Sequence, residues 1–338
     1  MNTTVFGSGA WGTAIALLLH DNRHNVTLWS KFSDEIGTIR RTGRNPLLTG
    51  VDIPPDICLV SDINEAAHGK DAVVIATPSY AVRETVESLK GRLSDDCVVI
   101  CMSKGIETDT SSLFTGIIKA TLGEKVQIAA VSGPTHAEEV SRRIPTACVA
   151  ASEDIQVAER VQSLLINENF RVYTSTDVIG VELGAALKNV IALSAGISDG
   201  IGLGDNTIAM LMTRGLAEMA ELCVRMGGSK ETLAGLAGLG DLIVTCMSRH
   251  SRNRRAGVLI GKGASPQEAM REVGAVVEGY YAAKAAYTLS ESMDVEMPIC
   301  CEAYKVLYEG KDPLIAMKSL MNRKRRSEQV SGGEIWVS

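Results

Sequence analysis

The sequence of 338 residues has no excess of basic residues: 34 Lys and Arg stand against 40 Asp and Glu, for a net charge of −6. A protein that neutralises many nucleic-acid phosphates usually carries a basic surplus, so we expect no nucleic-acid partner. Hydrophobic residues make up 45% and charged residues 22% of the chain, as in soluble globular proteins. This composition excludes a disordered chain and a collagen-like one.

Signals for a metal, a membrane and export are also missing. No two Cys-x-x-Cys pairs occur and the five histidines do not fall at ligand spacings, so we expect no metal site. No window of about 18 residues is free of charged or strongly polar side chains, which argues against a membrane partner. The eight cysteines lie mostly in apolar runs, and Met1-Asn-Thr-Thr carries no basic stretch of a signal peptide. The sequence therefore predicts a cytoplasmic protein.

The first half of the chain alternates short apolar runs with segments of helix length, which is typical of a parallel sheet. After about Asp177, strand-like runs become rare and long stretches rich in Ala, Leu and Met follow. We predict an α/β protein with an N-terminal Rossmann-like doubly wound sheet (1–180), a C-terminal all-helical domain (181–330) and a tail (331–338). The expected strands are 4–6, 25–29, 57–60, 72–76, 97–102, 126–131, 146–150 and 170–173.

A glycine-rich motif, Gly7-Ser-Gly9-Ala-Trp-Gly12, directly follows the first expected strand and precedes a helical run. Glycines at this spacing allow a tight turn, close approach of a pyrophosphate to the backbone, and close packing of helix on strand. The start of the helix would offer unpaired N–H groups to phosphates. The motif predicts a dinucleotide site; the alternative is a glycine turn without a ligand.

The second expected strand ends in Trp29-Ser30-Lys31 and offers no carboxylate for the ribose 2′-hydroxyl of NAD. A cation at Lys31 can attract a 2′-phosphate, whereas Asp34 lies too far into the next helix to be the first choice for the ribose. This pattern predicts that NADPH is accepted at least as well as NADH. The alternative is that Lys31 is a surface residue.

Two loops follow later strands, Ser103-Lys-Gly-Ile-Glu107 and Ser132-Gly-Pro-Thr-His-Ala137. Ligands bind at the carboxyl ends of strands in doubly wound sheets. Lys104 would offer a cation there, and Gly133 and Thr135 would offer hydrogen-bond donors. Taken alone, each loop also reads as an ordinary turn.

Lys188 lies in the apolar run Val181–Ser198, where burial would lower the pKa of its ammonium towards the range of proton transfer. The alternative is a lysine whose stem packs while its ammonium reaches water. Asp241 follows a glycine-rich turn and is either a helix cap or the acidic partner of Lys188. The run Ser251-Arg-Asn-Arg-Arg255 suits phosphate recognition, although an isolated run of this kind is usually a solvated face.

Taken together, the motifs resemble the NAD(P)-dependent glycerol-3-phosphate dehydrogenase family of the soluble bacterial type. The resemblance rests on GSGAWGTA, SKGIE, SGPTHAEEV, ELGAALKNVIALSAGISDGIGLGDN, GLAGLGDL, HSRNRR and VVEGYYAAK, in that order. It implies reversible reduction of dihydroxyacetone phosphate to glycerol 3-phosphate by NADPH or NADH, which supplies glycerophospholipid synthesis. It also implies a homodimer.

The resemblance implies a role for each matching residue. The catalytic residues would be Lys188, Lys104 and Asp241, with Lys188 as proton donor and acceptor. The substrate would contact Lys104, Gly133, Thr135, Lys188, Asp241, Ser251, Arg252 and Asn253. The cofactor would contact Gly7, Gly9, Ala10, Trp11, Gly12, Lys31, Lys104, Ala137, Arg252, Val276 and Glu278.

Two positions depart from the family pattern. Ala10 stands where members often have Ser, and Ile208 where many have a basic residue. Two alternatives remain open at this point. The β-hydroxyacid dehydrogenases and ketopantoate reductases share a Rossmann domain, a helical domain and an active-site lysine. A dinucleotide sensor without catalysis would keep the glycine loop, but it would not need Lys188 together with Asp241.

Overall fold

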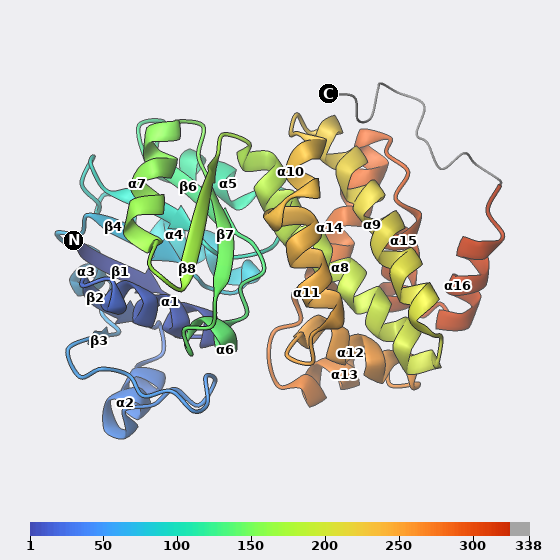
Figure 1. Cartoon of the computed structure of the whole chain (residues 1–338), viewed down its shortest axis with the longest axis horizontal. Coiled ribbons are helices and arrows are strands. Elements are labelled where there is room, and N and C mark those ends of the chain that lie inside the picture. The colour runs from blue at the N-terminus through green and yellow to red at the C-terminus, as the bar shows by residue number, and fades with distance from the viewer. Residues whose placement is uncertain (325–338) are drawn as a thin grey trace.

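The computed structural model describes residues 1–324, so the expected tail at 331–338 lies outside the described residues. Its N-terminal part is an eight-stranded sheet in the order β3-β2-β1-β4-β5-β6-β7-β8 (Figure 1). The strands are β1 (Asn2–Phe6), β2 (Asn25–Trp29), β3 (Cys58–Val60), β4 (Ala72–Ile75), β5 (Val98–Cys101), β6 (Gln127–Ser132), β7 (Thr146–Ala151) and β8 (Phe170–Ser175). All eight strands expected from the sequence are present, with small shifts of their ends.

One feature of the sheet departs from the expectation of parallel strands. β7 pairs with β6 in the antiparallel sense, and β8 then runs parallel to β7. The segment between β6 and β7 holds only the four-residue helix α6 (Ala137–Val140). A parallel return needs a crossover, usually through a longer helix, so this connection reverses the chain direction instead.

The helices of the N-terminal part cover both faces of the sheet. They are α1 (Ala10–Asp21), α2 (Ser33–Thr42), α3 (Ile63–Ala67), η1 (Ser79–Ala81), α4 (Val82–Ser88), α5 (Phe114–Leu122) and α7 (Ile155–Leu165). One apolar core lies between the sheet and α1, α6 and α7, and a second lies between the sheet and α3, α4 and α5. Neighbouring strand residues such as Val74 and Ile75 point to opposite cores. The strands are therefore apolar on both faces, as their sequences predict.

Beyond β8 the described chain is helical. The elements are α8 (Val178–Ile201), α9 (Asp205–Arg225), α10 (Lys230–Ala234), η2 (Leu236–Gly240), α11 (Asp241–Met247), α12 (Arg252–Gly261), α13 (Pro266–Val273), α14 (Glu278–Met293), α15 (Pro298–Tyr308) and α16 (Pro313–Met321). Figure 1 shows these helices gathered beside the sheet. The α8 helix begins three residues before the expected start of the helical part.

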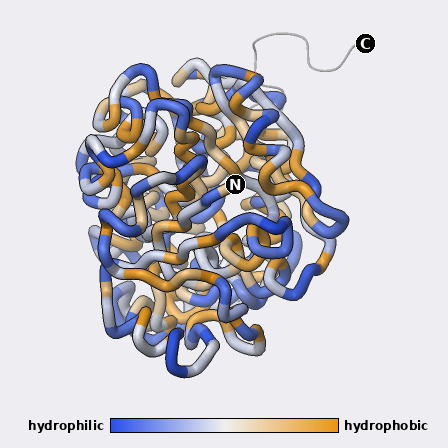
Figure 2. The backbone as a smooth tube through the Cα atoms, turned by 90° about the vertical axis from the view of Figure 1, so that its left-hand side faces the viewer, coloured by the Kyte–Doolittle hydropathy of each residue, from blue (hydrophilic) through white to orange (hydrophobic). Residues whose placement is uncertain are grey.

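The long helix α8 is the centre of this helical part. It packs on α9, α11, α12 and α14, and also on β6 of the sheet. Within residues 1–324 it is long and apolar enough to cross a membrane by length and composition, but 83% of its most apolar window is buried inside the fold. The helix is therefore the apolar core that the sequence predicts. Figure 2 shows blue hydrophilic stretches along much of the outline of the backbone, with orange hydrophobic stretches between them.

Glycines bring α8 and α12 unusually close. A Cβ added at Gly257 would lie 2.1 Å from the carbonyl oxygen of Leu193, and one added at Gly196 would lie 2.2 Å from that of Arg254. Real Cβ atoms do not approach backbone oxygens so closely, and a helix backbone cannot move alone. The two glycines therefore set the distance between the helix that carries Lys188 and the helix that begins at Arg252.

We predict that Gly257→Ala lowers the free energy of unfolding by about 1–3 kcal/mol or more, because the added methyl forces the two backbones apart. Gly116→Ala is the matched control, since Gly116 is an exposed helical glycine whose added Cβ meets nothing within 4 Å. The control should be neutral or stabilising by up to about 1 kcal/mol. Urea-induced unfolding followed by circular dichroism measures both. Equal unfolding midpoints would contradict the close helix contact.

Candidate active site

The glycine loop joins β1 to α1 in the shape that its motif predicts. Gly7 has φ +119°, and a Cβ added there would lie 2.7 Å from the carbonyl oxygen of Ala76; a Cβ on Gly12 would lie 1.8 Å from that of Gly7. A Cβ on Gly9, by contrast, would meet nothing within 4 Å. No side chain caps the start of α1, at Ala10. The loop therefore leaves open space and unpaired N–H groups where a pyrophosphate would bind.

Trp11 connects this loop to the end of β5. Its indole Nε1 donates to the carbonyl oxygen of Met102 at 3.1 Å, and its ring lies 5.9 Å from the Lys104 Nζ. That distance allows a cation–π contact. A residue of the dinucleotide loop thus helps to position a lysine from a later loop.

A cluster of two lysines and one aspartate lies between the sheet and the helices; Lys188 and Asp241 are buried and Lys104 is half-buried. Lys188 from α8 donates to Asp241 Oδ1, and Lys104 from the loop after β5 donates to Asp241 Oδ2 at 2.9 Å. Lys188 is 5% exposed and Asp241 1% exposed. Asp241 is the first residue of α11, and its carboxylate accepts from these lysines instead of capping that helix. The sequence alternative of a simple cap is therefore wrong.

The two lysines differ in how many of their ammonium N–H groups have an acceptor. Lys104 uses three acceptors: Asp241, the carbonyl oxygen of Gly133 at 2.9 Å and Thr135 Oγ1 at 3.1 Å. Lys188 has two partners in residues 1–324, Asp241 and Thr245 Oγ1 at 3.0 Å. An ammonium has three donors, so Lys188 keeps one proton without an acceptor in this part of the chain.

Charge and burial shift the pKa values in this cluster. Burial lowers the pKa of Lys188 to about 7; the Asp241 charge opposes this decrease and the Lys104 charge adds to it. Burial alone would raise the pKa of Asp241, but the two lysines outweigh burial and hold it below its ordinary value. The cluster therefore holds a carboxylate beside a lysine that can exchange a proton near neutral pH. The alternative of a solvent-reaching Lys188 is wrong.

Three further residues join the cluster that the sequence analysis did not single out. Thr245 lies one turn after Asp241 on α11, so its position on the same helix face was a signal available in the sequence. Ser132 Oγ donates to Asp241 Oδ2 at 3.3 Å. His136 lies beside the cluster, and burial, followed by the Lys188 charge, lowers its pKa. Its Nε2 is buried and has no hydrogen-bond partner in residues 1–324.

Gly133 and Thr135 contribute acceptors for Lys104, whereas the sequence analysis expected them as donors. Thr135 also donates to the carbonyl oxygen of Gly133 at 3.0 Å. Both residues are buried beside the cluster, at the carboxyl end of β6. They therefore hold the ammonium of Lys104 together with Asp241.

The residues of the run that starts at Ser251 differ in whether they have hydrogen-bond partners within the chain. Ser251 is the N-cap of α12 and accepts from the backbone N–H of Arg254. Asn253 is buried, donates to Asn189 at 2.9 Å and accepts from the backbone N–H of Gly279 at 2.8 Å. The Arg252 side chain is exposed and makes no hydrogen bond or ion pair within residues 1–324. Arg252 and Arg255 are therefore the exposed cations of this run without a hydrogen-bond or ion-pair partner in residues 1–324, whereas Arg254 pairs with Asp199.

The residues expected on the cofactor side come from both parts of the chain. Ala137 begins α6 and is buried, and Val276 is half-buried just before α14. Glu278 begins α14 and accepts from the backbone N–H of Ser79 at 3.2 Å, which joins the helices to the sheet. Burial raises the pKa of Glu278 against the hydrogen bond of Ser79 and the charge of Arg252.

Unpaired polar atoms at this edge fit a dinucleotide. Thr77 Oγ1, Ser79 Oγ and Glu278 Oε2 are buried without a hydrogen-bond partner in residues 1–324. Buried polar atoms normally have partners, so a run of three beside the glycine loop indicates a ligand. These atoms, the loop at Gly7–Gly12 and Arg252 are the groups that would hold the cofactor.

Two further positions lie away from the cluster: Lys31, which is expected near the adenosine ribose, and Ile208, where many family members have a basic residue. Lys31 is exposed after β2 and forms an ion pair with Glu84. Ile208, one of the two departures from the family pattern, is 9% exposed and packs in the core of the helical part. Lys31 and Ile208 therefore have other partners within residues 1–324, and neither contacts the lysine–aspartate cluster.

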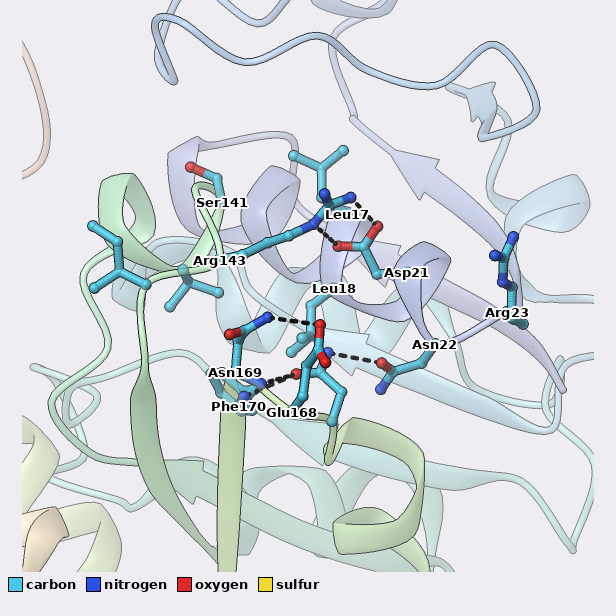
Figure 3. A pocket seen from close by; sticks show the side chains of 13 residues that line it. Leu17, Leu18, Asp21, Asn22, Arg23, Ser141, Arg143, Glu168, Asn169 and Phe170 are labelled. Carbon is cyan, nitrogen blue, oxygen red and sulfur yellow. Dashed lines mark hydrogen bonds and ion pairs between the residues drawn. The ribbon is translucent and has the colours of Figure 1, made fainter.

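A separate hollow of about 360 Å³ lies on the sheet side, between α1 and the start of β8 (Figure 3). Its walls are held by partners within the chain: Arg143 pairs with Asp21 at 2.8 Å, and Asn22 accepts from Asn167 at 2.9 Å. None of the residues of the cluster or of the glycine loop lines it. The hollow is therefore distinct from the candidate active site.

Three features together are typical of a nicotinamide-dependent dehydrogenase: a dinucleotide loop, a helical second part, and a buried lysine whose pKa is lowered to about 7. Comparison with known proteins gives the family. Residues 2–158 match the model of the NAD-dependent glycerol-3-phosphate dehydrogenase N-terminus, and residues 177–318 match that of its C-terminus. The chain belongs to the NAD-dependent glycerol-3-phosphate dehydrogenase family and is an oxidoreductase that uses NAD(P).

Individual relatives agree with this assignment. A glycerol-3-phosphate dehydrogenase [NAD(P)+] of Thermoanaerobacter sp. (strain X514) is 51% identical over 97% of this chain and 99% of that protein. The crystal structure of the Coxiella burnetii glycerol-3-phosphate dehydrogenase superposes with a TM-score of 0.92 at 36% identity, covering 95% of this chain and 99% of that one.

The rival families share only the fold. A ketopantoate reductase from Ralstonia eutropha superposes with a TM-score of 0.57 at 16% identity, covering 95% of this chain and all of that one. The match to both family models and the 51% identical relative, and not this likeness, decide against the rival dehydrogenases and the dinucleotide sensor.

Proposed function

We propose that Lys188, Lys104 and Asp241 are the catalytic residues of a glycerol-3-phosphate dehydrogenase that reversibly reduces dihydroxyacetone phosphate to glycerol 3-phosphate. The observation that carries the assignment is the cluster in which one carboxylate accepts from two lysines. The cluster lies where the ends of β5 and β6 meet α8 and α11. When bound, the reduced nicotinamide supplies the hydride, and that chemistry belongs to the cofactor.

Lys188 supplies the proton in this proposal. Reduction of the carbonyl leaves negative charge on its oxygen, which must receive a proton. The unpaired N–H of Lys188 is the donor for that oxygen, and the neutral amine accepts the proton in the reverse direction. Asp241 and Thr245 fix the ammonium so that its remaining donor has one direction.

Lys104 acts through its charge. Its three donors are already used by Asp241, Gly133 and Thr135, so it has none left for the substrate. Two lysines against one aspartate nevertheless leave the cluster with a net positive charge when both are protonated. Such a preorganised charge in a water-poor site favours the developing alkoxide.

Arg252 anchors the phosphate of the substrate. It is an exposed guanidinium without a partner in residues 1–324 and lies at the first position of α12. Arg suits bidentate recognition of phosphate oxygens. The buried chain from Asn189 through Asn253 to Gly279 holds the start of α12 in place and leaves one amide proton of Asn253 for a ligand.

The two roles predict different kinetic defects. Lys188→Ala should lower kcat by ~10²–10⁴, the usual contribution of general acid–base catalysis, and leave the affinity for dinucleotide nearly unchanged. Arg252→Ala should mainly raise KM for dihydroxyacetone phosphate, because it removes a contact to the phosphate. Steady-state rates of NAD(P)H oxidation measure both. Arg255→Ala is the matched control, since Arg255 is an exposed arginine of the same run.

A Lys188→Ala enzyme with near-normal kcat would remove the lysine from the mechanism. Unphosphorylated dihydroxyacetone serves as a second check, since a phosphate anchor requires that this substrate lose turnover as well as affinity. Comparable turnover of dihydroxyacetone or of a 2-keto acid would contradict the assigned substrate.

The pKa of Lys188 gives the reaction a pH dependence with opposite signs in the two directions. Reduction needs the ammonium, so its kcat should be full below about pH 7 and fall roughly tenfold per pH unit above it. Oxidation of glycerol 3-phosphate needs the neutral amine and should rise over the same range. Asp241→Asn removes the charge that raises the pKa, so both transitions should move to lower pH. Profiles that do not move would separate Asp241 from the titration of Lys188.

We further propose that the enzyme is a cytoplasmic homodimer without a nucleic-acid or membrane partner, and that it supplies glycerol 3-phosphate to glycerophospholipid synthesis. All eight cysteines are free, which suits a reducing compartment. The net charge of −6 does not suit a nucleic-acid partner. Sedimentation velocity at micromolar concentration should give a mass of about twice the 36.0 kDa of one chain, and a mass of one chain would contradict the dimer.

A further inference from the structure

A carboxylate occupies the junction between the glycine loop and the end of β2. Glu35 Oε2 accepts from Ser8 Oγ and from Ser30 Oγ, both at 2.6 Å. Ser8 lies between Gly7 and Gly9, Ser30 directly follows β2, and both serines are buried. In dinucleotide-binding folds this junction is where an Asp or Glu binds the ribose 2′-hydroxyl of NAD.

This arrangement is more than a helix cap. Glu35 is in the first turn of α2, where a carboxylate is favoured by the helix dipole and often accepts from the N-cap backbone N–H. Here the N-cap N–H, that of Phe32, donates to Ser30 Oγ at 3.3 Å instead. The carboxylate therefore turns towards the glycine loop, held there by two hydroxyl donors.

The second oxygen of the carboxylate remains available. Both serines donate to Oε2, and Glu35 Oε1 has no hydrogen-bond partner within residues 1–324. The side chain is exposed, so a ligand can reach it. A ribose hydroxyl could donate to Oε1 without breaking either serine contact. Such a bond to a charged acceptor is among the stronger hydrogen bonds in proteins.

The cations near this junction have other partners. Lys31 is paired with Glu84, Arg44 with Asp52, and Arg40 donates to the carbonyl oxygen of Leu59. A 2′-phosphate would therefore meet the negative charge of Glu35 while the neighbouring lysine shares its charge with another carboxylate. This arrangement of charges disfavours NADPH, whereas Lys31 at the end of the strand favours NADPH when the sequence is considered alone.

We propose that Glu35 binds the 2′-hydroxyl of the adenosine ribose, so that the enzyme binds NADH more tightly than NADPH. The 2′-hydroxyl donates to the carboxylate, and a phosphate in its place is repelled. This replaces the sequence-based expectation that NADPH is accepted at least as well as NADH. The proposal depends on the glycine loop and is independent of the role of Lys188.

Isothermal titration calorimetry with NADH and with NADPH, in the absence of substrate, tests the proposal. Wild-type protein should bind NADH about tenfold or more tightly than NADPH, since hydrogen bonds to charged groups are worth at least that ratio. Glu35→Gln keeps the shape of the side chain but removes its charge, and should bring the two dissociation constants to within about threefold. Because the side chain is exposed, the variant should unfold at the wild-type temperature.

Asp34→Asn is the matched control, because Asp34 is an exposed carboxylate of the same helical turn without a contact to Ser8 or Ser30. It should leave the ratio of the two dissociation constants unchanged. Two results would overturn the proposal: wild-type protein that binds NADPH as tightly as NADH, or a ratio that is the same in wild type and Glu35→Gln. Both readouts are binding constants, so they stand apart from any failure of the proposed catalytic roles.

Discussion

The carboxylate of Asp241 is the interaction on which the candidate site depends. It is 1% exposed and accepts from lysines of two different parts of the chain. A buried charge without a partner costs several kcal/mol, so the carboxylate of Asp241 needs the lysines to stay ionised inside the fold, and Lys188 needs Asp241. Removing Asp241 would leave two like charges facing each other, whereas removing either lysine would leave an ion pair. The cluster thus joins the sheet to the helices and fixes their relative position.

The close packing of α8 gives this charge cluster its environment. Gly184 lets η2 approach α8, since an added Cβ would lie 2.4 Å from the carbonyl oxygen of Ala237. That approach delivers Asp241, four residues later, to Lys188. Water is excluded from the ammonium at the same time, and burial is the largest cause of its low pKa. Close packing at small residues of the helices therefore contributes to the lowered pKa of Lys188 as well as to the stability of the fold.

The polar groups beside the glycine loop differ from those of the lysine–aspartate cluster. The glycine loop, the start of α1 and the buried atoms of Thr77, Ser79 and Glu278 present polar groups without partners in residues 1–324. Unpaired buried groups reduce stability, so they persist where a ligand restores their hydrogen bonds. These groups lie outside the lysine–aspartate cluster, so the proposed mechanism assigns recognition of the dinucleotide and transfer of the proton to different residues.

Local patterns in the sequence were sufficient for the elements and several single residues. Runs of three to six mostly apolar residues predict the eight strands because both faces of the sheet are buried, and the spacing of Gly7, Gly9 and Gly12 predicts the turn into α1. The apolar run around Lys188 predicts a buried lysine. Contacts between distant residues were decided by the tertiary structure, because they depend on the path of the chain between them. Asp241 lies 137 residues from Lys104, and Glu35 reaches back 27 residues to Ser8. The strand end alone indicates Lys31 for the ribose, whereas the turn of α2 brings a carboxylate there instead.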